Sequence, residues 1–158
     1  MTQPAAAAEV YAGFWIRLWA AIVDSLLWAV FAVPVLWAAY GPQAFQSDKF
    51  IEGPVDFLVS NVFPAVATIL FWVYKEATPG KMAVHARVVD ARTGGHPSTG
   101  QYIGRYFAYF LSLLPLGLGF LWVAWDGRKQ GWHDKLAATV VVRRRRNASE
   151  LATFETSA

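Results

Sequence analysis

Three long windows without a single charge divide the chain, and short polar connections separate them. No Asp, Glu, Lys or Arg occurs in residues 25–47, 57–74 or 106–125, and most residues in these windows are apolar. Uncharged, apolar segments of 18 residues or more are long enough to cross a hydrocarbon layer about 30 Å thick. The first two windows therefore predict transmembrane helices over about Trp15–Ala38 and about Val55–Tyr74.

The third window contains a helix-breaking sequence at its centre, LLPLGLG over residues 113–119. Proline removes a helical hydrogen bond and clashes with the preceding turn, and the two glycines relax the backbone further. We therefore interpret Thr99–Leu114 and Leu118–Trp125 as the two arms of a re-entrant helical hairpin. One kinked span is the alternative, because 20 residues at 1.5 Å each would also cross the layer.

Two valine-rich runs predict short strands. Val84–Asp90 and Ala138–Arg143 are bounded by turn residues, as strands usually are. We expect them to pair, which places both on one membrane face and favours the hairpin; the alternative is that one or both extend neighbouring helices. The expected fold is thus an all-α membrane protein. It has two transmembrane helices, a third segment broken by proline and glycine, and a small cytoplasmic β element.

The basic residues indicate the orientation. Cytoplasmic connections of membrane proteins carry an excess of Lys and Arg near the ends of their spans. Residues 41–54 contain one such residue, residues 75–105 contain five, and the C-terminal stretch contains seven. We therefore expect a multi-pass protein of the cell (inner) membrane with both termini in the cytoplasm. We divide it into an N-terminal tail (1–13), a transmembrane domain (14–146) and a disordered C-terminal tail (147–158).

Composition excludes several classes of protein. Charged residues make up 16% of the chain and hydrophobic ones 56%, against about 25% and 45–50% in soluble domains. This balance argues against a soluble globular enzyme, a disordered chain and a nucleic-acid-binding protein, despite the net charge of +3. The absence of cysteine excludes disulfides, thiol catalysis and thiolate metal sites.

Catalytic and metal-binding patterns are missing as well. The three histidines, His85, His96 and His133, are 11 and 37 residues apart, so no pair has the helical spacing of metal ligands. We find no nucleophile–base pair, no phosphate-binding loop and no cluster of metal ligands. The sequence therefore predicts a protein that is not an enzyme and needs no cofactor or metal.

Asp24 is a charge at an unusual depth in the first predicted helix. It follows Arg17 by seven residues, nearly two helical turns, so the two side chains share a face that is otherwise small and polar. A carboxyl at this depth costs about 2.5–3.5 kcal/mol to insert and usually has a functional or pairing reason. Asp24 is either a proton-exchanging group with a raised pKa or an inert staple between helices, and the sequence favours neither.

Arg17 lies where the first helix enters the membrane. It is an interfacial anchor or the partner of a carboxylate, for which Asp126 and Asp134 are the candidates. Asp126 could cap a hairpin arm, whereas Asp134 would start a short helical turn, where a carboxylate suits the helix dipole. The run Arg143, Arg144, Arg145 and Arg146 predicts a lipid-surface anchor worth about 1 kcal/mol per residue near anionic lipid.

Three blocks of the sequence, in order, resemble the RDD family of bacterial integral membrane proteins, which is named for one arginine and two aspartates. The first block is FWIRLWAAIVD, and the second is TPGK followed by RVVD. The third is LPLGLGFLW, then Asp126 and RKQGWHDKLA. The resemblance covers roughly residues 14–143. A family glycine between the last leucine-alanine pair and a threonine is replaced by Ala138, which weakens the case for a tight turn there.

The resemblance implies a functional polar site. Arg17 and Asp24 match the family's arginine and first aspartate, and Asp134, ahead of Asp126, matches the second. Some family members are assigned cation/proton antiport, so we expect exchange of monovalent cations and protons as the leading function. Two or three spans cannot enclose a pathway, so exchange would require a homo-oligomer in the lipid bilayer. The alternative is a non-transporting membrane scaffold or assembly factor.

Overall fold

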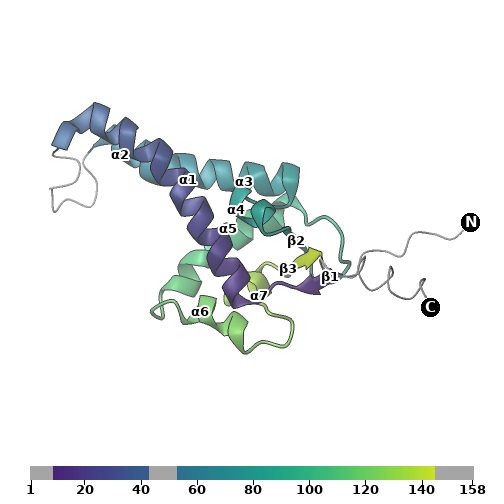
Figure 1. The fold of residues 1–158 in the computed structure, drawn as a ribbon. Coiled ribbons are helices and arrows are strands. Elements are labelled where there is room, and N and C mark those ends of the chain that lie inside the picture. The colour runs from purple at the N-terminus through teal and green to yellow at the C-terminus, as the bar shows by residue number, and fades with distance from the viewer. Residues whose placement is uncertain (1–8, 43–52, 145–158) are drawn as a thin grey trace, which may run out of the picture.

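The computed structural model describes residues 9–42 and 53–144. The predicted C-terminal tail lies outside the described residues, as do Arg145, Arg146 and most of the predicted N-terminal tail. The fold is mostly helical, with a small sheet at one end of two long helices (Figure 1).

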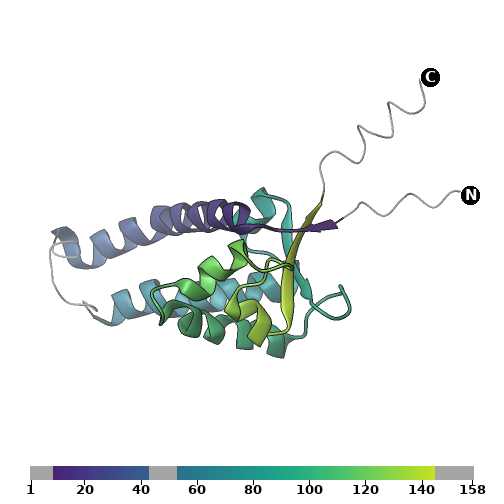
Figure 2. The same ribbon diagram turned by 90° about the horizontal axis from the view of Figure 1, so that it is seen from below.

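The two long helices match the first two apolar windows. Helix α1 covers Phe14–Tyr40. The second begins as α2 (Pro54–Phe57), passes through the π-helical turn η2 (Leu58–Val62) and continues as α3 (Phe63–Lys75). Both are long and apolar enough to cross a membrane. They contact each other at the end away from the sheet, where Trp28 and Phe31 of α1 stack on Phe63, and lie apart nearer the sheet (Figure 2). The predicted spans are therefore confirmed as helices, which extend one or two residues beyond the expected bounds.

The third window forms a sharply bent pair of helices, as the sequence predicts. Helix α5 (Thr99–Leu113) begins at a capping box in which Ser98 and Gln101 exchange hydrogen bonds. After the break at residues 114–117 the chain continues as α6 (Leu118–Leu121) and the 3₁₀ turn η3 (Trp122–Ala124), at an angle of 113° to α5. The break is tight because Leu116 and Gly117 both adopt left-handed backbone conformations.

Three antiparallel strands form the sheet in the order β1–β3–β2. β2 (Ala86–Asp90) and β3 (Thr139–Arg144) are the predicted pair, with Val88 opposite Val141. Strand β1 (Glu9–Tyr11) was not predicted and pairs with the other side of β3. Since α5 follows β2 and η3 precedes β3, the hairpin starts and ends on the side of the sheet. A single straight span would separate these strands.

Two short helices, α4 (Pro79–Ala83) and α7 (Trp132–Leu136), connect the sheet to the long helices. The main core lies between these layers, where Val88 and Val141 of the sheet pack with Trp72 of α3 and Tyr102 of α5. The turn between α7 and β3 is present although it lacks the family's glycine. Ala138 adopts φ 51° there, a conformation that costs an L-residue about 1–2 kcal/mol.

Candidate functional site

A buried carboxylate on α7 joins three parts of the chain. Asp134 is 0% exposed, and its two oxygens form ion pairs with Arg17 of α1 and Arg105 of α5. The backbone N–H of Gly131 donates a third hydrogen bond, at 2.9 Å. Burial raises the pKa of the Asp134 carboxyl, but the charges of Arg105 and Arg17 outweigh this effect, so the pKa is held well below its usual range.

The two arginines bind more than the carboxylate. Arg17 Nε donates to the carbonyl oxygen of Ala12 at 3.0 Å, and its Nη2 donates to that of Lys129. Arg105 Nη1 also donates to the hydroxyl of Thr139 at 2.7 Å. The cluster therefore ties α1, α5, α7 and the start of β3 together.

Asp24 forms a separate connection, between α1 and α4. Its carboxylate accepts hydrogen bonds from the hydroxyl of Thr78 at 2.5 Å and from the backbone N–H of Gly80 at 2.6 Å. No ion pair joins it to any of the described cations. Arg17 and Asp24 thus lie along one side of α1, as predicted, but hold different partners. Asp24 therefore links α1 to the start of α4, and its role in proton exchange stays a prediction.

Asp126 lies apart from this cluster. It forms an ion pair with Lys135, and its carboxylate accepts hydrogen bonds from the backbone N–H groups of Arg128 and Gln130, both at 3.1 Å. It thus caps the loop before α7. The structure brings Arg17 to Asp134 and not to Asp126. Arg143 and Arg144 are exposed at the end of β3, and their role as a lipid-surface anchor stays a prediction.

Two cations of the site were missed in the sequence. Arg105 is only 1% exposed and directly precedes the third charge-free window. In the sequence it is one of five basic residues in 75–105, and Lys81 is the last residue of the TPGK block. The signal that could have found Arg105 is its position next to an apolar segment, where a cation needs a partner or water, whereas Lys81 has no such signal.

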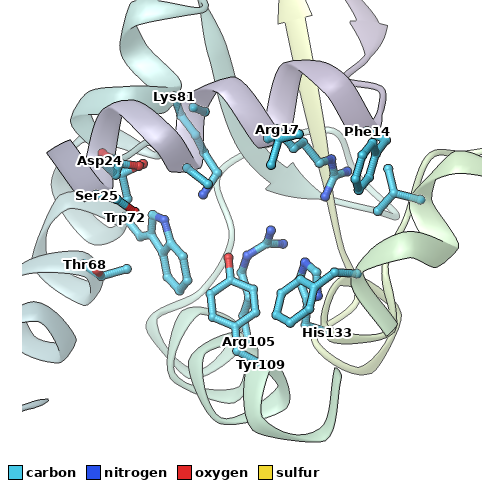
Figure 3. A pocket seen from close by; sticks show the side chains of 16 residues that line it. Phe14, Arg17, Asp24, Ser25, Thr68, Trp72, Lys81, Arg105, Tyr109 and His133 are labelled. Carbon is cyan, nitrogen blue, oxygen red and sulfur yellow. The ribbon is translucent and has the colours of Figure 1, made fainter. Parts of the chain in front are cut away.

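A cavity of about 460 Å³ lies between α1, α3, α5 and the α6–η3 arm. Figure 3 shows Lys81, Arg17 and Arg105 reaching into it from α4, α1 and α5. Among the described residues, Asp24 is the one carboxylate in its lining. The cavity therefore carries more positive than negative side chains.

His133 of α7 also lines the cavity and packs against the rings of Tyr109 and Phe120, at 4.5 and 5.0 Å between centroids. Its Nδ1 lies 3.2 Å from the hydroxyl oxygen of Ser112. Burial, reinforced by the neighbouring cations Arg105 and Arg17, lowers the pKa of His133 to about 3 although Asp134 opposes the shift. The folded protein therefore holds this imidazole neutral.

This pKa predicts acid sensitivity. An unfolded chain protonates His133 below about pH 6.5, so the unfolded state binds the extra proton and the free energy of unfolding falls with pH down to about 3. We expect it to be about 1.4 kcal/mol lower at pH 5.5 than at pH 7.5, measured by guanidinium titration in detergent. His133→Asn should remove most of this difference, and His85→Asn should keep it. An unchanged difference in His133→Asn would contradict the assignment.

Comparisons with known proteins identify the family. The model of the RDD family matches residues 11–138, which is most of the chain. The uncharacterized protein YxaI of Bacillus subtilis is 31% identical over 150 residues, covering 85% of this chain and 98% of its own length. The uncharacterized protein RP437 of Rickettsia prowazekii is 39% identical over 75 residues, which are 48% of this chain and 41% of that protein. No solved structure matches significantly. The chain thus belongs to the RDD family of membrane proteins.

Proposed function

We propose that this protein is a multi-pass protein of the bacterial inner membrane that binds an anion in the cavity between α1, α3 and α5. The observation that carries the proposal is the charge around the cavity. Arg17, Lys81 and Arg105 line it, whereas Asp24 and the neighbouring Asp134 supply two carboxylates, so the basic groups outnumber the acidic ones by one. Burial lowers the pKa of the Lys81 amine, and a bound anion would stabilise its charged form.

The hydrogen bonds favour an anion over a cation. Both oxygens of Asp24 already accept hydrogen bonds from α4, and both oxygens of Asp134 are held by arginines. A metal cation would have to displace these donors and enter a region that the three basic side chains make positive. In a low-dielectric setting such repulsion is much stronger than in water.

The same geometry supports a binding role without catalysis. Ser112 and His133 lie next to each other, but Ser112 is 0% exposed and its hydroxyl donates to the carbonyl oxygen of Ala108 at 3.1 Å. A substrate cannot reach a nucleophile buried in this way. The end of the molecule that carries the sheet faces the cytoplasm in this proposal, with both termini there and α5 and α6 re-entering the membrane.

Cation–proton exchange in a homo-oligomer is the second candidate function. One observation favours it, because Asp24 places a carboxylate in the lining of a cavity beside a predicted span. A second copy would have to supply further negative charge. A scaffold role is favoured by the two aspartate connections, which fasten the sheet layer to the long helices.

Anion binding is tested by thermal unfolding of the purified full chain in detergent. Sodium phosphate should raise the unfolding temperature more than sodium chloride of equal ionic strength, because a bound anion stabilises the folded state. Lys81→Met should lose the part of this difference that comes from binding and keep only the general stabilisation that phosphate gives any folded protein. Lys75→Met, which replaces an exposed lysine at the end of α3, should keep the whole difference. Equal responses of Lys81→Met and wild type would overturn anion binding. Cation-driven proton flux in proteoliposomes that Asp24→Asn removes would support exchange instead.

A further inference from the structure

Three hydrogen-bond donors around the cavity have no acceptor. Arg105 Nε and Trp72 Nε1 are buried without a hydrogen-bond partner. Lys81 lies with its Nζ 5.2 Å from the centre of the Trp72 ring, and within the described ranges it forms neither a hydrogen bond nor an ion pair. Burying a donor without an acceptor is unfavourable, which applies to Arg105 and Trp72, whereas Lys81 is half-buried. The cavity thus suits a ligand that is rich in acceptor oxygens.

The origin of the donors indicates the shape of the acceptor group. They come from α3, α4 and α5, so they approach the cavity from different sides (Figure 3). A carboxylate has two oxygens in one plane and suits the planar fork of a single guanidinium group. A phosphate group directs its oxygens tetrahedrally and pairs well with lysine and arginine. The donor set therefore favours phosphate.

The rest of the lining is apolar and reaches the outside of the molecule. Phe14, Leu18 and Ala21 of α1 face Phe120 and Val123 of the α6–η3 arm across the cavity. Leu18 is 38% exposed and Ala21 is exposed too, so the cavity opens along the outer side of α1. With α1 in the membrane, as proposed above, this opening would face hydrocarbon.

The size of the cavity also exceeds that of a bare anion. Pockets of about 300–1,000 Å³ bury drug-sized molecules, and this one measures about 460 Å³. Inorganic phosphate would leave the apolar part empty. A hydrocarbon chain fills it and enters sideways from the bilayer without crossing water.

We propose that the ligand of this cavity is a membrane amphiphile whose headgroup is a phosphate of net negative charge. Lys81, Arg105 and Trp72 donate to the phosphate, and the hydrocarbon chain lies between Leu18 and Ala21 of α1 and the α6–η3 arm. This inference rests on the proposed anion site and names its ligand class.

Native mass spectrometry of the full chain in detergent tests the proposal. The probes are phosphatidic acid, oleate as a carboxylate amphiphile, and phosphatidylcholine as a zwitterion. We expect phosphatidic acid to bind at least tenfold more tightly than either of the others. Lys81→Met should weaken its binding about tenfold, and Lys81→Arg and Lys75→Met should preserve it. If oleate binds as tightly as phosphatidic acid does, the assignment of a phosphate headgroup is overturned.

A substitution in the apolar part of the cavity distinguishes a lipid ligand from free phosphate. Ala21→Leu adds volume to the chain-binding half and leaves every donor in place, so it should weaken phosphatidic acid binding and keep the stabilisation by inorganic phosphate. Lys81-dependent stabilisation by inorganic phosphate without lipid binding would overturn the amphiphile and leave the anion site standing. Failure of both ligands would overturn both proposals. If Lys81→Met does not fold, the loss of phosphatidic acid binding in Ala21→Leu tests the proposal without it.

Discussion

Asp134→Asn is expected to lower the free energy of unfolding by about 3–5 kcal/mol, the range for breaking a buried ion pair. The substitution keeps the shape of the side chain and removes its charge. Arg17 and Arg105 would then lie side by side without a counter-charge, and Arg105 is only 1% exposed. Repulsion between two buried cations adds to the lost hydrogen bonds.

Guanidinium titration in detergent measures this loss, with Asp126→Asn as the matched control. Asp126 also forms an ion pair. Its own side chain is 12% exposed, but its partner Lys135 is 46% exposed, so water reaches and partly screens the pair. Exposed ion pairs contribute about 0–1 kcal/mol, and the control should lose little more than that. Equal losses in the two variants would contradict a special role for Asp134.

The triple variant Arg17→Met, Arg105→Met and Asp134→Leu shows whether unpaired charge or lost contacts cause the lower free energy of unfolding of Asp134→Asn. Replacing a whole buried ionic cluster by apolar side chains is often neutral for stability. We expect the triple variant to regain most of what Asp134→Asn loses. A triple variant as unstable as Asp134→Asn would show that the hydrogen bonds, rather than the unpaired cations, set the loss.

The sequence predicted the long helices because charge and hydropathy are local properties. The spans, the break before Gly117 and the β2–β3 pair could all be predicted from consecutive residues. Strand β1 is only three residues long and has no pattern of its own, so nothing local indicated it. It forms because β3 offers it an edge.

The site was harder to predict because its contacts join distant residues. The Asp24 carboxylate binds Thr78 and Gly80, which are 54 and 56 residues away. Spacing along α1 correctly placed Arg17 and Asp24 on one side of the helix, but it could not give their partners. The motif around Asp134 favoured it over Asp126 as the family's second aspartate, which stays a prediction, and the structure pairs Asp134 with Arg17. Arg105 had no motif and was missed.

The two aspartates explain why the cavity exists. Asp24 fastens α4 to α1 at one end of the cavity, and Asp134 fastens α7 to α1 and α5 at the other. Lys81 lies on α4, so the first connection also sets where its amine points. We infer that the aspartates position the binding groups, while the cations contact the ligand.

Gly80→Ala tests this positioning and should lower the free energy of unfolding by about 3 kcal/mol, the upper part of the usual range for overpacking. A Cβ atom at residue 80 would lie 2.0 Å from the carbonyl oxygen of Ala20 and 2.8 Å from Cγ of Asp24. The contact atom is backbone of a long helix, so it cannot move aside. Helix α4 must shift away from α1, which breaks the hydrogen bond to Asp24.

The shift should move Lys81 with it, so Gly80→Ala should also weaken phosphatidic acid binding about as much as Lys81→Met does. Gly104→Ala is the matched control, because a Cβ atom there meets nothing within 4 Å and the residue lies inside α5. Alanine is favoured over glycine in a helix by about 0.5–1 kcal/mol, so the control should gain stability and keep lipid binding. Gly80→Ala as stable as wild type would show that α4 does not need its close contact with α1. Normal lipid binding in an otherwise destabilised Gly80→Ala would show that Lys81 is positioned by something other than this contact.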